Sequence, residues 1–174
     1  MDPPPGELVA LLERRRAHGL DRWDEVWEGV LHVNPPPSRE HERLVMHVAR
    51  LLGPHADAAG LDLLGGVGIG SVDDNRVPDL VLQRPQDGRP QWQDTVELAV
   101  EIRSPGDDAL KKLSFYAAHR VDELVIVDPQ ECTIEWLALT EGEYRKIERN
   151  SLIDLGGADL AHRIDWRSAD RVDR

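Results

Sequence analysis

Two acidic residues at the ends of short β-type runs have the chemistry to hold a divalent cation. Asp79 lies in the run 76–80, and Glu101 lies in the run 100–105. A helical pattern follows the second run and carries Lys112. Two carboxylates on neighbouring strands, with an ammonium close by, are what metal-dependent cleavage of a phosphodiester requires.

Carboxylate oxygens with few other donors suit Mg²⁺ or Mn²⁺ better than zinc. If the strand of Asp79 pairs with the strand of Glu101, both carboxylates converge as ligands of one cation. Such a cation polarises a phosphate and lowers the pKa of an attacking water. Lys112, or Arg103 on the same strand face as Glu101, would then stabilise the developing negative charge.

The spacing of residues 95–103 and 106–119 places these groups. Alternating apolar residues predict a strand over 95–103, with Glu97, Glu101 and Arg103 on one face. Glu97 lies about 13 Å along the strand from Glu101, too far for the same metal. In the helix predicted over 106–119, Lys112 flanks the apolar face beside Tyr116, whereas Lys111 and Phe115 point away from it.

His41 is a further candidate. The sequence predicts a helix that begins at the N-cap Ser38 and ends at Gly53-Pro54. His41 shares the apolar face of this helix near its start. Two interpretations are open: a hydrogen-bonded structural histidine, or a metal ligand or proton carrier.

The remaining pattern predicts an α/β (α+β) fold. An N-terminal helix ends near Gly19, and a β-hairpin over 22–33 turns at Glu28-Gly29. Further strands are expected at 77–82, 124–127, 133–139 and 144–147, and the chain from Gly156 is weakly patterned. At 174 residues we expect a single domain over 1–174.

Composition limits the cellular location, the kinds of cysteine site and the binding partners that the chain can have. No run approaches the ~20 apolar residues of a membrane span, and no signal-peptide pattern is present, so we expect a cytoplasmic protein. One cysteine, Cys132, excludes a disulfide framework and a multi-cysteine zinc site. The net charge of −12 opposes DNA binding at long range. Local basic patches at residues 14–16 or at Arg39, Arg43 and Arg50 could offset it.

A set of motifs between about residues 22 and 139 resembles a known family. The motifs are Trp-Glu-Gly-Val at 27–30, Pro-Pro-Ser at 36–38 with His41, Val-Pro-Asp at 77–79, Val-Glu-Ile-Arg-Ser-Pro at 100–105, Lys-Leu-Ser-Phe-Tyr at 112–116, Val-Asp-Glu-Leu at 121–124 and Val-Asp-Pro at 127–129. Together they are similar to the Uma family of restriction endonuclease-like proteins, in the PD-(D/E)XK nuclease superfamily.

The resemblance implies a restriction-endonuclease-like fold, in which a mixed central sheet is flanked by helices, with Asp79 and Glu101 as metal ligands. It also implies that the superfamily's strand lysine has migrated to the helix, as Lys112, because Arg103 occupies the strand position. The chain departs from the family pattern at Glu28, where Asp is common, and at 123–125, where Glu-Leu-Val replaces Glu-Tyr-Trp.

We therefore expect a Mg²⁺-dependent (or Mn²⁺-dependent) endonuclease acting on DNA. The alternatives are a non-catalytic interaction or regulatory module that keeps the nuclease fold, and a metal-dependent hydrolase of a small phosphate ester. A homodimer is expected because cutting both strands needs two sites.

Overall fold

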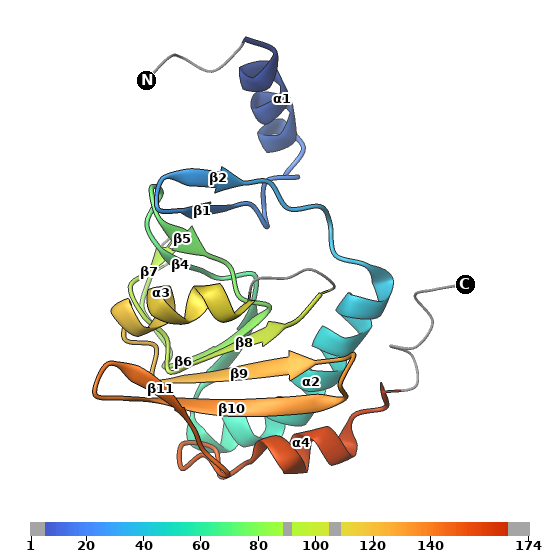
Figure 1. Cartoon of the computed structure of the whole chain (residues 1–174), viewed down its shortest axis with the longest axis vertical. Coiled ribbons are helices and arrows are strands. Elements are labelled where there is room, and N and C mark those ends of the chain that lie inside the picture. The colour runs from blue at the N-terminus through green and yellow to red at the C-terminus, as the bar shows by residue number, and fades with distance from the viewer. Residues whose placement is uncertain (1–5, 89–91, 105–108, 167–174) are drawn as a thin grey trace.

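The computed structural model describes residues 6–88, 92–104 and 109–166, and within these ranges it has two β-sheets and four α-helices (Figure 1). The six-stranded sheet has the order β11-β10-β9-β8-β6-β3. Its strands are β3 (Asp62–Gly65), β6 (Leu80–Gln83), β8 (Leu98–Ile102), β9 (Glu123–Asp128), β10 (Thr133–Thr140) and β11 (Glu143–Lys146). Only the β8–β9 pairing in this sheet is parallel, so the sheet is mixed, as predicted.

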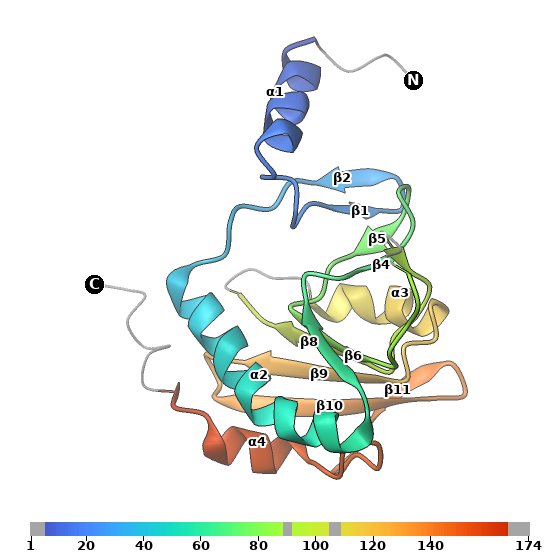
Figure 2. The same cartoon turned by 180° about the vertical axis from the view of Figure 1, so that it is seen from behind.

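Both faces of the six-stranded sheet are covered, as Figures 1 and 2 show. The helices α2 (Arg39–Ala59) and α4 (Gly157–Arg163) cover one face, and α3 (Leu113–Ala118) lies on the other. Along β8 the alternate residues Leu98, Val100 and Ile102 belong to the α2 side, whereas Ala99 packs with α3. Glu101 follows the same alternation as Ala99 and therefore points toward α3.

A second sheet of five strands, which the sequence did not predict as a unit, lies beside α3 (Figure 1). Its order is β2-β1-β5-β4-β7. The strands are β1 (Glu25–Trp27), β2 (Val30–His32), β4 (Gly68–Gly70), β5 (Asn75–Arg76) and β7 (Trp92–Gln93). The β1–β2 hairpin turns at Glu28 and Gly29, both at positive φ, which confirms the predicted turn.

The helix that carries His41 begins as predicted but ends later. The Ser38 side chain accepts a hydrogen bond from the His41 N–H at 3.1 Å, which is an N-cap contact. The predicted end at Gly53-Pro54 is wrong, because the helix continues through Pro54 to Ala59 and is capped by Gly60. The last turns bury Ala56 in the core, and this packing outweighs the backbone hydrogen bond that Pro54 removes.

The segment after β8 also differs from the prediction. The predicted start of its helix at Gly106 lies outside the described residues, and the described part is a 3₁₀ turn (Ala109–Lys112) followed by α3. Phe115, expected to point outward, is buried against Arg76 of the second sheet. The amphipathic pattern could not predict this, because a 3₁₀ turn shifts the phase of the helix.

The weakly patterned C-terminal region contains α4, which packs closely on β10. A Cβ atom at Gly157 would lie 2.7 Å from the Ile134 carbonyl oxygen. The N-terminal helix α1 (Gly6–Ala17) is present as predicted, but it has no buried residue. Every helix in the described ranges is too short or too polar to cross a lipid bilayer.

We expect Gly157→Ala to lower the free energy of unfolding by about 1–3 kcal/mol, because the backbone of β10 must move to admit the methyl group. Denaturant unfolding followed by fluorescence measures the change. The neighbouring exposed Ala158→Ser is the control and should change stability by less than about 0.5 kcal/mol. Equal stabilities of the two variants would contradict the close packing of α4 on β10.

Candidate active site

Asp79 lies in a bend directly before β6, where it contacts both β8 and α2. Its N–H donates to the Val100 carbonyl at 3.0 Å, and its Oδ2 accepts from the Ile102 N–H at 2.7 Å. The register Leu80↔Val100, continued by one residue, places Asp79 opposite Glu101. The structure thus puts the two candidate carboxylates at the same end of two paired strands.

His41 contacts Asp79 from the first turn of α2. His41 Nε2 donates to Asp79 Oδ1 at 2.8 Å, and Ser104 Oγ lies 3.5 Å from His41 Nδ1. The hydrogen bond to Asp79 raises the pKa of His41, although burial opposes it. His41 therefore fixes the orientation of one carboxylate oxygen of Asp79.

Glu101 and Lys112 form the buried centre of the site. Glu101 is 3% exposed and Lys112 is 7% exposed. Lys112 Nζ lies 3.1 Å from Glu101 Oε1 and 3.2 Å from Oε2, and the Tyr116 hydroxyl donates a short hydrogen bond to Oε1. Lys112 reaches Glu101 although it belongs to the 3₁₀ turn rather than to α3.

Glu25 completes this centre and was missed by the sequence analysis. It is 3% exposed on β1, and its Oε1 accepts from Lys112 Nζ at 3.0 Å. It also accepts from the Val77 N–H at 2.8 Å and, through Oε2, from the Trp27 indole at 2.8 Å. The available signal was the alternation of the hairpin strand, which places Glu25 on the same face as Trp23 and Trp27.

The charges in this centre shift one another's pKa values. Burial raises the pKa of Glu101 to about 7; the Lys112 charge opposes this rise, and Asp79 and Glu25 add to it. Burial alone would lower the pKa of Lys112, but the charges of Glu101 and Glu25 outweigh burial and raise it. Lys112 is therefore a permanent cation between two carboxylates.

Two other candidates lie in different ion pairs. Arg103 forms a short ion pair with Asp128 at the end of β9, so its guanidinium is engaged there. Glu97 precedes β8 and accepts from Arg84 Nε at 3.0 Å, where β6 ends and β8 begins. Neither residue shows a contact with Asp79, Lys112 or Glu101 among the described residues.

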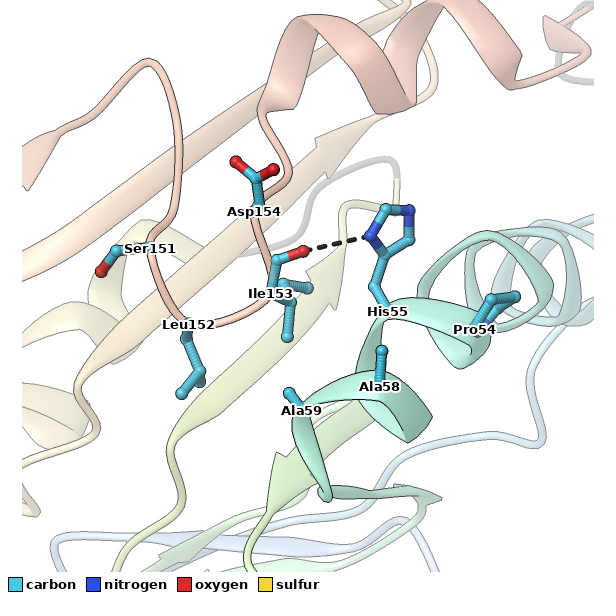
Figure 3. Close-up of a pocket in the computed structure, with 8 residues that line it drawn as sticks. All are labelled: Pro54, His55, Ala58, Ala59, Ser151, Leu152, Ile153 and Asp154. Carbon is cyan, nitrogen blue, oxygen red and sulfur yellow. Dashed lines mark hydrogen bonds between the residues drawn. The ribbon is translucent and has the colours of Figure 1, made fainter.

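The described surface also has a pocket remote from these carboxylates, shown in Figure 3. Residues 54, 55, 58 and 59 of α2 form one wall and residues 151–154 form the other. His55 Nδ1 donates to the Ile153 carbonyl at 3.1 Å across it. Since none of the candidate site residues lines this pocket, it has no part in the chemistry of Asp79 and Glu101.

Comparison with known proteins agrees with the fold. A family model described as "Uma2: Putative restriction endonuclease" matches residues 11–160. The crystal structure of a "putative nuclease belonging to DUF820" from Anabaena variabilis ATCC 29413 superposes with a TM-score of 0.60 at 18% identity, covering 80% of this chain and 90% of that one. A DrdV–DNA complex determined by cryo-electron microscopy matches with a TM-score of 0.40 at 17% identity, over 76% of this chain and 13% of that one. No curated protein matches the chain.

Proposed function

This chain belongs to the Uma2 family, and from that premise we propose that it is a Mg²⁺-dependent endonuclease that hydrolyses phosphodiester bonds in DNA. The observation that carries the proposal is the arrangement of Asp79, Glu101 and Lys112. Two carboxylates end paired strands, and a buried ammonium lies 3.1 Å from one of them. Burying the charges of Glu101, Lys112 and Glu25 in this way costs stability, so such clusters concentrate at functional sites.

The carboxylates have the donor chemistry that a hard divalent cation prefers. Among the described residues each Asp79 oxygen accepts a single hydrogen bond, which leaves each a lone pair for a metal. No cluster of three or more His, Cys, Asp or Glu side chains able to hold a metal occurs in the described ranges. Mg²⁺ commonly uses one or two carboxylates, with water and substrate phosphate as the other ligands, so Asp79 and Glu101 fit it.

A bound Mg²⁺ or Mn²⁺ would supply phosphate polarisation and a water of lowered pKa. The chain's own residues would prepare the site. Lys112 would offer positive charge to the phosphate oxygens in the transition state, while Glu25 holds the ammonium in place from the other side. Tyr116 and His41 would orient Glu101 and Asp79 through their hydrogen bonds.

The acidic net charge is the main objection to a DNA substrate. The surface of α2, however, carries a local row of positive charge. Arg39, Arg43 and Arg50 are exposed and recur at i, i+4 and i+11, which places them within about 40° of one another around the helix. Arg39 and Arg43 lie two residues to either side of His41 and therefore on the opposite side of the helix from it, at the end of α2 that reaches the site. We propose that this row contacts the phosphate backbone beside the site.

The decisive experiment is a cleavage assay on plasmid and single-stranded DNA with Mg²⁺, with Mn²⁺ and with a chelator. We expect cation-dependent cutting that falls at least about a hundredfold in Asp79→Ala and in Glu101→Ala. Glu97→Ala is the matched control, because Glu97 pairs with Arg84 instead, and should cut like the wild type.

Equal cutting by the wild type and both site variants would refute the site assignment. Absence of cutting by every protein, with DNA binding retained, would favour a non-catalytic module, which the net charge of −12 also favours. Hydrolysis of a small phosphate ester without DNA cleavage would replace DNA as the substrate.

A further inference from the structure

We propose that α1 is a self-association surface on which the α1 helix of a second copy of this chain docks in antiparallel orientation. The proposal concerns assembly and does not depend on nuclease activity. It starts from the position of α1, which stands clear of both sheets at one end of the molecule (Figures 1 and 2).

The helix is attached to the rest of the chain through Arg15. Arg15 forms a salt bridge with Asp24 at 2.7 Å and donates to the carbonyls of Leu20 and Asn34 at 2.8 and 3.2 Å. No residue of α1 is buried. The base of the helix is therefore fixed, while Leu8, Val9 and Leu11 remain exposed.

A helix of 12 residues is marginal in water without packing. Leu8 is 43% exposed and Leu11 is 49% exposed. Of the ten large apolar side chains that are exposed in the described ranges, seven lie between Leu8 and Val33. Because exposed apolar residues gather in this one region of the chain, which includes the projecting helix, a protein contact there is a better explanation than chance scatter over the surface.

The charges of α1 identify the second copy as the partner. With Leu8 and Leu11 at heptad positions a and d, Glu7 and Arg14 both occupy position g. In an antiparallel pair, a packs against d and g faces g of the other helix. The register that packs Leu8 on Leu11 of the second copy thus brings Glu7 beside Arg14 of the second copy.

Two-fold symmetry repeats each of these contacts, so one surface is complementary to itself. Neither Glu7 nor Arg14 forms a salt bridge with another described residue, which leaves both side chains available. The hairpin at the base of α1 extends the surface, because β2 is an edge strand with Val30 60% and Leu31 43% exposed.

Sedimentation velocity of the full chain over a wide concentration range tests the proposal. The wild type should show a reversible monomer–dimer equilibrium. Glu7→Arg and Arg14→Glu each set two like-charge pairs across the symmetry axis and should weaken dimerisation about tenfold. The double variant Glu7→Arg/Arg14→Glu restores opposite charges and should dimerise like the wild type.

Mixing the two single variants should produce a heterodimer, because both cross-pairs are then attractive. Leu8→Ser/Leu11→Ser should abolish dimerisation, whereas Met46→Ser, at an exposed apolar residue of α2, should leave it unchanged. Thermal melting of each variant checks that the body stays folded.

A wild type that is monomeric at every concentration overturns the proposal, as does a dimer unaffected by the α1 variants. A monomer whose Arg14→Glu variant loses DNA affinity would identify α1 as a nucleic-acid contact and would also overturn it. Cleavage activity plays no part in these readouts, so the result is independent of the proposed function.

Discussion

Lys112→Met is expected to lower the free energy of unfolding by about 3–5 kcal/mol when a chelator removes divalent cations. The substitution leaves Glu25 and Glu101, each 3% exposed, facing one another without the ammonium that both of them contact. Above the raised pKa of Glu101, two buried carboxylates without a cation repel each other and lack solvation; below it Glu101 takes up a proton and the loss is smaller. Denaturant unfolding of the purified variants measures the loss.

The matched control is Lys146→Met, which breaks an exposed ion pair with Glu135 at 3.1 Å and should cost less than about 0.5 kcal/mol. Adding Glu101→Gln to Lys112→Met should recover part of the lost free energy of unfolding, because it removes one of the two buried carboxylates that lack a cation. Equal stabilities of Lys112→Met and Lys146→Met would show that the buried ion cluster does not exist in solution.

The pH dependence of this loss has a defined sign. Burial raises the pKa of Glu101 from 4.5 to about 7. Between these two pH values Glu101 is protonated in the folded protein and ionised in the unfolded chain. The contribution of Glu101 to the free energy of unfolding is therefore fully present below pH 4.5 and is lost as the pH rises through about 7. Without the Lys112 charge the pKa of Glu101 rises further, so Lys112→Met should keep losing stability at higher pH than the wild type.

Local sequence chemistry predicted the elements whose shape depends on few residues. Glu28-Gly29 predicted the hairpin turn, Ser38 predicted the start of α2, and the alternation along 98–102 predicted the face of β8 that carries Glu101. In each case a backbone preference or one hydrogen bond decides the conformation.

Features that depend on tertiary packing were not predictable in this way. The helix α2 continues past Pro54 because Ala56 packs in the core, and Phe115 is buried because Arg76 and the second sheet cover it. The polar residues of the site also divide into those that the local sequence predicts and those that depend on tertiary packing. Lys112 was chosen from helical spacing and does contact Glu101, although it lies in a 3₁₀ turn, whereas Glu25 comes from a hairpin that joins a different sheet, 101 − 25 = 76 positions away from Glu101.

The second large effect concerns divalent cations. Mn²⁺, used as a calorimetric probe for the proposed Mg²⁺ site, is expected to bind the wild type and to raise its melting temperature, since a ligand that binds only the folded state stabilises it. Asp79→Asn and Glu101→Gln keep the side-chain shape but remove a charged oxygen ligand, so each should weaken Mn²⁺ binding at least about a hundredfold.

Glu97→Gln is the control, because Glu97 pairs with Arg84 at the other end of β8 from Glu101 and should not contribute to Mn²⁺ affinity. Because the Lys112 ammonium lies 3.1 Å from Glu101 and competes with a cation for its negative charge, Lys112→Met should instead bind Mn²⁺ more tightly and recover stability when the cation is added.

A wild type without measurable Mn²⁺ binding, or a Glu97→Gln variant that binds Mn²⁺ as weakly as Glu101→Gln, would contradict the assignment of Asp79 and Glu101 as ligands. Tighter binding together with lost cleavage in Lys112→Met would separate the two roles: the carboxylates hold the cation, and the ammonium acts on the phosphate.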